Sequence, residues 1–163
     1  MLTRSFAGKL VGLIVVIVAI TAWFVMRPGT PANGVAVVPA RWTFVDTAGL
    51  DAADERLAEA VTAQAMERGR VPVLPWRVIR PFQSKPQRAP ELAKETGATR
   101  VMAISVRQTG SQSRVTVFLA EPYTGRSLWA EDFYAQELAT PESIRNLAQT
   151  IVHDLEIALG ATR

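Results

Sequence analysis

Hydrophobic and polar positions divide the chain into one long apolar run near its start and a series of short periodic patterns behind it. The run Leu10–Met26 contains seventeen residues without a charge and is bounded by Lys9 and Arg27. A membrane-spanning helix needs about 17–25 such residues, and the long aliphatic stem of Lys9 lets the helix begin earlier because its ammonium group reaches the headgroups. The pattern predicts a transmembrane helix over residues 6–27.

Two other interpretations of this apolar run stay open. A cleaved signal peptide has an apolar core of about 7–15 residues that ends at a small-x-small site. The sequence Thr30-Pro31-Ala32 is a weak match to such a site, since Pro31 is unfavourable there. A core-facing helix of a soluble domain would carry a polar stripe on its other side, and this run has none. We expect an uncleaved anchor.

The flanking charges predict the orientation of this anchor. Arg4 and Lys9 precede the run, and Arg27 alone follows it before Arg41. Because basic residues are enriched on the cytoplasmic side, we expect a cytoplasmic amino terminus and a periplasmic domain at the inner membrane. Residues 28–33 (PGTPAN) form a linker to a domain of residues 34–163. This linker is short, because an extended residue spans about 3.3–3.6 Å, so the domain is expected to lie near the membrane.

The first half of the domain alternates strand and helix patterns. Residues 34–40 (GVAVVPA) are wholly apolar, which favours a strand buried on both faces. Asp51 is placed to cap a helix whose apolar stripe ends at Gly69, and residues 71–74 form a second short strand pattern. Residues 75–90 are rich in proline and basic residues, and Pro75, Pro81 and Pro86 are expected to hold the backbone of residues 75–88 extended. Pro90 then opens a short helix that ends at residue 97.

The second half predicts three consecutive strands and a final helix. Residues 100–107, 113–121 and 126–134 alternate in polarity and are separated by turn sequences. The last helix begins after Thr140, with a buried stripe expected at Ile144, Leu147, Ile151, Leu155 and Ala158. The element order βαβαβββα predicts an α/β fold with an α+β-like mixed sheet and helices mainly on one face, the two long ones together.

The net charge of +3 does not indicate nucleic-acid binding. Arg4, Lys9 and Arg27 account for all of it, and the rest of the chain carries 15 basic and 15 acidic residues. A nucleic-acid-binding domain concentrates positive charge on itself, so no nucleic acid is expected as a partner. The chain has no Cys, which excludes disulfides, thiolate metal sites and a cysteine nucleophile.

The domain shows no pattern typical of an enzyme. It lacks G-x-x-x-x-G-K, G-x-G-x-x-G and G-x-S-x-G sequences. Its single histidine, His153, falls within the last helix pattern, and the pair Glu131-Asp132 lies on a strand whose alternation sends the two carboxylates to opposite faces. We therefore expect a non-enzymatic protein with no catalytic residue, metal site or cofactor.

The segment between Arg68 and Arg88 is the one stretch with a distinctive composition. It holds six basic residues and no acidic one, interleaved with Trp76, Ile79 and Phe82. The segment is either a solvated loop with its apolar residues in the core, a protein contact surface, since Trp and Arg dominate interface hot spots, or a site for anionic lipid headgroups. The partner-contact residues we select are Trp76, Arg77, Arg80, Phe82, Lys85 and Arg88.

The second half of the domain also resembles a known family. Residues 95–107, 113–119 and 124–131 read ETGATRVMAISVR, SRVTVFL and TGRSLWAE. They are similar to the helix end, hairpin and Thr-Gly-x-x-Leu-Trp-Ala-Glu strand of the TolB-type amino-terminal domain. Thr96 stands where that family has Leu before Gly. The resemblance extends over residues 35–159 and is most specific in its second half.

The first half departs further from the family. Val37-Val38-Pro39 is similar to its opening Val-Leu-Pro-Phe, with Ala40 in place of Phe, and the family's Asn-Leu-Ser-Gly-Asp-like loop is absent. The resemblance implies a small mixed α/β envelope module used for protein–protein contact, with no catalytic residue carried over. The β-propeller that follows this module in TolB is missing, which puts the partners of the propeller in doubt here.

Taken with the anchor, these features lead to one functional hypothesis and one alternative. The hypothesis is a membrane-anchored periplasmic interaction or assembly module of an envelope complex, with protein partners in or near the inner membrane. The alternative is a small-ligand sensor domain that signals to a membrane partner. A buried polar pocket would favour the sensor, whereas a flat surface of apolar and Arg side chains would favour assembly.

The predicted orientation gives a direct test. A reporter that is active only outside the cytoplasm, fused after Arg163, should be active in cells, because Arg4 and Lys9 hold the amino terminus inside. A reporter that is active only in the cytoplasm, at the same position, serves as the control. Activity of the second reporter alone would reverse the orientation.

Overall fold

The computed structural model describes residues 34–42, 53–84, 88–136 and 138–161. The predicted anchor, the linker and the capping residue Asp51 lie outside these ranges. Within them, no helix combines the length and apolarity that a membrane span requires. The fold below is therefore that of the domain alone.

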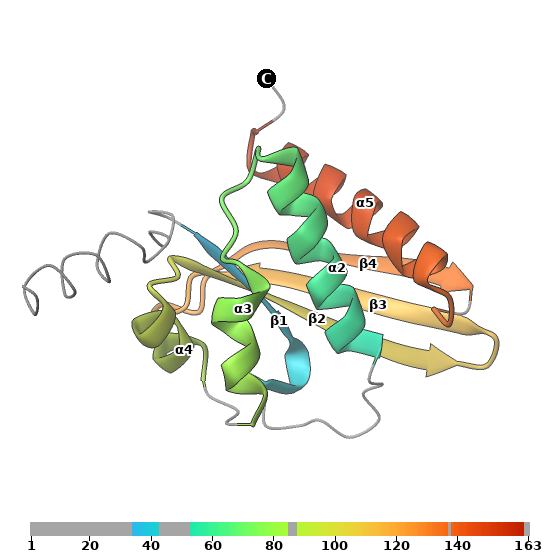
Figure 1. Cartoon of the computed structure of the whole chain (residues 1–163), viewed down its shortest axis with the longest axis horizontal. Coiled ribbons are helices and arrows are strands. Elements are labelled where there is room, and N and C mark those ends of the chain that lie inside the picture. The colour runs from blue at the N-terminus through green and yellow to red at the C-terminus, as the bar shows by residue number, and fades with distance from the viewer. Residues whose placement is uncertain (1–33, 43–52, 85–87, 137, 162–163) are drawn as a thin grey trace, which may run out of the picture.

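The described residues form a four-stranded mixed sheet (Figure 1). Its strands are β1 (Val35–Pro39), β2 (Arg100–Thr109), β3 (Gln112–Ala120) and β4 (Ser127–Gln136), arranged in the order β1-β2-β3-β4. The pair β1–β2 is parallel, and the pairs β2–β3 and β3–β4 are antiparallel. The mixed sheet expected from the sequence is thus confirmed.

Helices cover the two faces of this sheet unequally. The long helices α2 (Ala53–Arg68) and α5 (Pro141–Ala158) pack on one face (Figure 1), and the short helices α3 (Trp76–Ile79) and α4 (Ala89–Thr96) pack on the other. Two 3-10 turns, η1 (Ala40–Trp42) and η2 (Arg80–Ser84), follow β1 and α3. The two long helices share a face as predicted, but the short helices use the opposite one, so "mainly on one face" holds only for the long pair.

Strand β1 is buried from both sides, as its apolar run predicts. Val35 and Val37 face the cluster made with α2 and α5, whereas Ala36 and Val38 face the cluster made with α3 and α4. In β2 the same alternation continues through its first half. All five residues of β1 are buried, so the two clusters meet across this strand.

The other half of the sheet is covered on one face only. On β3 and β4, Val115 and Phe133 point to the long helices, and Arg114, Thr116 and Asp132 point to the uncovered face. There the Arg114 guanidinium donates to one carboxylate oxygen of Asp132 and the Thr116 hydroxyl donates to the other, each at a distance of 2.6 Å. Register pairs Thr116 with Asp132, so this is a cross-strand polar ladder on a solvent-facing surface.

The predicted second strand at residues 71–74 is wrong as a strand. Only Val73 makes a bridge, to Val35, with the Val35 amide donating to the Pro72 carbonyl at 2.8 Å and the Leu74 amide to the Val35 carbonyl at 2.9 Å. Pro72 and Pro75 flank this contact, and neither has an N–H to extend a ladder. The segment therefore covers the edge of β1 without becoming a strand.

The extended backbone expected for residues 75–88 is also wrong, because residues 76–84 form helical turns. Proline fixes φ near −65°, a value that suits the first turn of a helix as well as an extended chain. Pro75 has φ −57° and ψ 140° directly before α3. Pro81 lies in the first turn of η2. The proline spacing thus fixes the turns rather than an extended segment.

The helix boundaries near glycine and threonine are confirmed. Gly69 and Gly97 have φ of 64° and 75° directly after α2 and α4, the left-handed conformation that ends helices. Thr140 accepts the Ser143 amide at 3.1 Å as the cap of α5. In the stripe predicted for α5, Ala158 is exposed because it lies in the last turn, whereas the other four residues are buried.

A buried carboxylate joins the two long helices at their carboxyl ends. The Glu156 side chain on α5 is fully buried, with Arg68 Nε 2.9 Å from one of its oxygens and Arg70 donating to the other at 3.4 Å. The Arg68 contact is Coulombic rather than a directed hydrogen bond, since Oε1 of Glu156 has no hydrogen-bond partner among the described residues. Both guanidinium groups remain partly exposed to water, whereas the carboxylate does not. The Glu156 charge therefore depends on its two Arg partners for stabilisation, and the Arg charges do not depend on Glu156.

We expect the two halves of this ion cluster to differ in their effect on stability. Replacing Arg68 and Arg70 with Met leaves the Glu156 carboxylate buried and unpaired, which costs about 3–5 kcal/mol. Glu156→Gln leaves two guanidinium groups that reach water, and the loss should be about 1–2 kcal/mol. Urea unfolding of residues 34–163, expected to be cooperative, measures both. Equal losses would contradict the asymmetry.

Candidate interaction surface

The six residues selected from the sequence do not share one environment. The structure places Trp76 and Phe82 half-buried, Arg77, Arg80 and Arg88 exposed, and Lys85 outside the described residues. Trp76 packs against both apolar clusters, and Phe82 packs against the cluster of α3 and α4. The aromatic members are therefore partly structural, and the basic members form the surface.

Trp76 is held by a partner that the sequence did not indicate. Its ring stacks on the ring of Trp42, with centroids 5.6 Å apart and planes at 26°. Trp42 is 4% exposed and belongs to η1, the turn directly after β1. Offset stacking of two large rings adds to their burial energy. Trp76 thus presents one face to the interior and keeps the rest at the surface.

Helical spacing turns Arg77 and Arg80 outward together. Trp76 and Ile79 point inward, and Ile79 is fully buried. Arg77 and Arg80 are three residues apart, a separation that puts side chains on the same side of a helical turn. Both are exposed, and neither forms an ion pair with any residue in the described ranges. Two guanidinium groups without an ion-pair partner among the described residues therefore lie on a segment that Trp76 and Ile79 pack against the core.

Arg88 lies at the start of the next helix. Its backbone amide donates to the Glu91 carboxylate at 3.2 Å, which closes the first turn of α4. Its side chain is exposed. We call Arg77, Arg80 and Arg88, with the half-buried Trp76 and Phe82, the basic surface.

The structure divides the basic stretch that the sequence presented as continuous. Arg68 and Arg70 pair with Glu156 where α2 ends, next to the start of β1. Arg77 follows Trp76, whose ring stacks beyond the carboxyl end of β1. A five-residue strand extends about 16–17 Å. The pair Arg68 and Arg70 and the pair Arg77 and Arg80 therefore lie toward opposite ends of β1.

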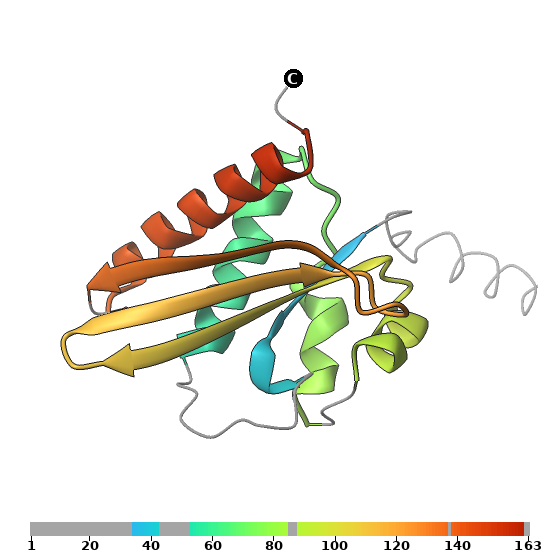
Figure 2. The same cartoon turned by 180° about the vertical axis from the view of Figure 1, so that it is seen from behind.

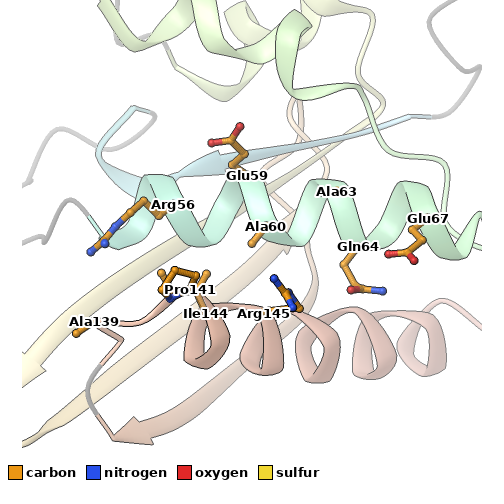
Figure 3. Close-up of a pocket in the computed structure, with 10 residues that line it drawn as sticks. All are labelled: Arg56, Glu59, Ala60, Ala63, Gln64, Glu67, Ala139, Pro141, Ile144 and Arg145. Carbon is orange, nitrogen blue, oxygen red and sulfur yellow. The ribbon is translucent and has the colours of Figure 1, made fainter.

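A groove of about 490 Å³ lies between α2 and the start of α5 (Figure 3). Alanines and Ile144 contribute its apolar part, and charges of both signs line it. The lining residues are Arg56, Glu59, Ala60, Ala63, Gln64, Glu67, Ala139, Pro141, Ile144 and Arg145. The groove is open to solvent, so it differs from the buried polar pocket that the sensor alternative would need.

A smaller cleft of about 300 Å³ lies beside the β3–β4 turn. Its lining residues are Thr99, Arg100, Glu121, Pro122, Tyr123 and Thr124. Glu121 is paired with the Arg126 guanidinium and accepts the Thr124 hydroxyl at 2.8 Å. These two hydrogen bonds, the Arg126 one first, hold the pKa of Glu121 below its usual value. The Glu121 carboxylate therefore stabilises the β3–β4 turn through its bonds to Thr124 and Arg126.

The titratable groups described by the structure lie on separate surfaces of the domain. Glu131 and Asp132 point to opposite faces, as predicted, and the Arg114 guanidinium lowers the pKa of Asp132, with Thr116 adding to the effect. His153 is exposed on α5. In the described ranges no group of three His, Cys, Asp or Glu side chains is placed to hold a metal ion.

No protein-family model and no curated protein matches this sequence. Solved structures do resemble it. TolB from Acinetobacter baumannii is 17% identical with a TM-score of 0.49, covering 78% of this chain and 28% of that one. Lipoprotein GNA1162 from Neisseria meningitidis is 16% identical with a TM-score of 0.49, covering 76% and 99%. A PelC dodecamer from Paraburkholderia phytofirmans is 17% identical with a TM-score of 0.44, covering 78% and 89%.

These likenesses concern the fold. The structural similarity to TolB that the motifs indicated is confirmed, and it extends to other small mixed α/β domains. This chain spans only 28% of the TolB chain. At such low identity the similarity does not identify a partner, and the surfaces of this chain must supply the functional inference.

Proposed function

We propose that this chain is a membrane-anchored module that binds a protein partner in an assembly at the inner membrane, with its domain on the periplasmic side. The anchor and its orientation come from the apolar run and the charges of residues 1–27. The partner contact is assigned to the basic surface. This assignment makes the domain a binding element with no catalytic role.

One observation carries the proposal: Arg77 and Arg80 are exposed, unpaired among the described residues, and fixed on helical turns. Buried Ile79 and the Trp42–Trp76 stack hold those turns. A guanidinium group on a fixed backbone loses less conformational freedom on binding than one on a loop. Because the unpaired groups are cationic, the partner surface should be acidic, with an apolar area opposite Trp76.

The position of the basic surface also favours a protein over the membrane that anchors the chain. The linker enters the domain at Gly34, before β1, whereas the basic surface begins near Trp42, beyond the end of β1. A surface at the far end of the domain is available to a partner that extends from the membrane. The interpretation of Arg77 and Arg80 as headgroup ligands is less favoured for this reason.

We expect Trp76→Ala to reduce stability rather than binding alone. The ring is half-buried and stacked, so its loss should cost about 2–3 kcal/mol, below the 3–5 kcal/mol of a fully buried Trp. Arg77→Glu with Arg80→Glu should change stability by about 0.5 kcal/mol or less, because both side chains are in solvent. Urea unfolding of residues 34–163 compares them. A stable Trp76→Ala variant would mean that the stack contributes little.

The partner is best found with the full chain in its membrane. A photo-crosslinking residue at position 88 should give a discrete adduct in membranes, and Arg77→Glu with Arg80→Glu should reduce that adduct about tenfold or more, since each interface Arg contributes on the order of 1–2 kcal/mol. Arg56→Glu with Arg145→Glu makes the same charge change on the helical face and should leave the adduct intact.

Two outcomes of this experiment would contradict the proposed surface. An adduct that is equally sensitive to both charge-reversed pairs would show a general effect of charge. An adduct that forms in full with Arg77 and Arg80 reversed would place the docking surface elsewhere. Mass determination of the adduct distinguishes a second copy of this chain from a different protein.

A further inference from the structure

The ends of several strands and helices lie close together around Gly34. Strands β1 and β2 are parallel and begin there together, with Val35 paired to Arg100 and the Thr99 amide donating to the Gly34 carbonyl at 3.0 Å. The β3–β4 turn lies at the same end, because Ala120 at the end of β3 is paired with Val101 at the start of β2. This end is the one that receives the linker.

The carboxyl ends of both long helices lie at this end as well. The Val35 amide binds the Pro72 carbonyl, four residues after α2 ends, and Arg70 binds Glu156 near the end of α5. In Figure 1 and Figure 2 the start of β1 lies between these helix ends on one side and the β3–β4 turn on the other. We call this end the Gly34 pole.

The Gly34 pole carries unusual apolar exposure. Four large apolar or aromatic side chains are exposed on the described domain, and three of them are here: Tyr123 at 67%, Ile157 at 54% and Met66 at 50%. The fourth, Tyr134 at 66%, lies near the other end of β4. Tyr123 belongs to the β3–β4 turn, and Met66 and Ile157 belong to the last turns of α2 and α5.

The charges around these side chains are arranged with the bases outward. Arg70 is 50% exposed and Arg126 is 68% exposed, whereas their acidic partners Glu156 and Glu121 are 0% and 33% exposed. Arg100 lines the cleft beside Tyr123. Guanidinium groups interspersed with a Tyr ring and aliphatic side chains are the combination that favours a lipid headgroup region.

We propose that the Gly34 pole rests on the phospholipid headgroups of the membrane that anchors the chain. This inference relies on the anchor in the proposed function but not on the basic surface. Residues 28–33 extend at most ~20 Å, which is less than the ~36 Å diameter of a compact domain whose radius of gyration is ~14 Å. The tether therefore holds this pole within ~20 Å of the bilayer surface. Tyr123, Met66 and Ile157 enter the interface, and Arg70, Arg100 and Arg126 bind phosphates.

Single labels on the full chain test this contact. The chain has no Cys, so Tyr123→Cys, Ile157→Cys and Tyr134→Cys each introduce one site for an environment-sensitive fluorophore. Tyr134→Cys is a matched control because Tyr123 and Tyr134 are equally exposed, at 67% and 66%. Each chain is reconstituted into phosphatidylcholine–phosphatidylglycerol vesicles that contain a lipid with a nitroxide on its headgroup.

Quenching by the nitroxide should be several-fold stronger at positions 123 and 157 than at position 134, since interfacial side chains lie within ~5–10 Å of the headgroup boundary. Equal quenching at all three positions, or weak quenching at 123 and 157, would overturn the contact. A chain that does not float with the vesicles would overturn the anchor and this inference together. Loss of the adduct at position 88 on reversal of Arg77 and Arg80 would still support the basic surface in that case.

Discussion

The burial of β1 on both faces is the constraint on which the rest of the domain depends. Its side chains alternate between two apolar clusters, and all five residues of the strand are buried. Each face must be covered by helices, because an apolar sheet face open to water loses the main stabilising term of folding. Helices α2 and α5 cover one face, and the turns of α3 and α4 cover the other. The basic surface exists because the second cover is made of short helical turns with outward Arg side chains.

The half of the sheet formed by β3 and β4 is covered by helices on one face only. Within the described residues, no strand pairs with the outer edge of β4, and an open edge favours pairing with other chains. Glu131 and Asp132 stand exposed in the middle of this strand, and charges at that place oppose edge-to-edge association. The uncovered face carries the Arg114–Asp132–Thr116 ladder. This face of the β3–β4 half is therefore exposed to water.

The sequence predicted the parts of the fold whose signals are local. The apolar run of β1, the stripe of α2 and the left-handed Gly97 depend on neighbouring residues only, and each is confirmed. The contact between Trp42 and Trp76 could not be predicted, since it joins a turn after β1 to a helix more than thirty residues later. The two-sided role of Trp76 and the division of the basic stretch both follow from that long-range packing. The predicted anchor lies outside the described residues and stays a prediction.

The placement of α5 has a consequence for the order in which the domain is made. Ile144, Leu147, Ile151 and Leu155 complete the cluster that α2 and the sheet begin, and Glu156 holds the Arg68–Arg70 corner. Until α5 leaves the ribosome, one face of the sheet has only half its cover and exposes apolar surface. Chains in this state are prone to aggregate. The domain therefore closes its larger apolar cluster only after α5 has been synthesised.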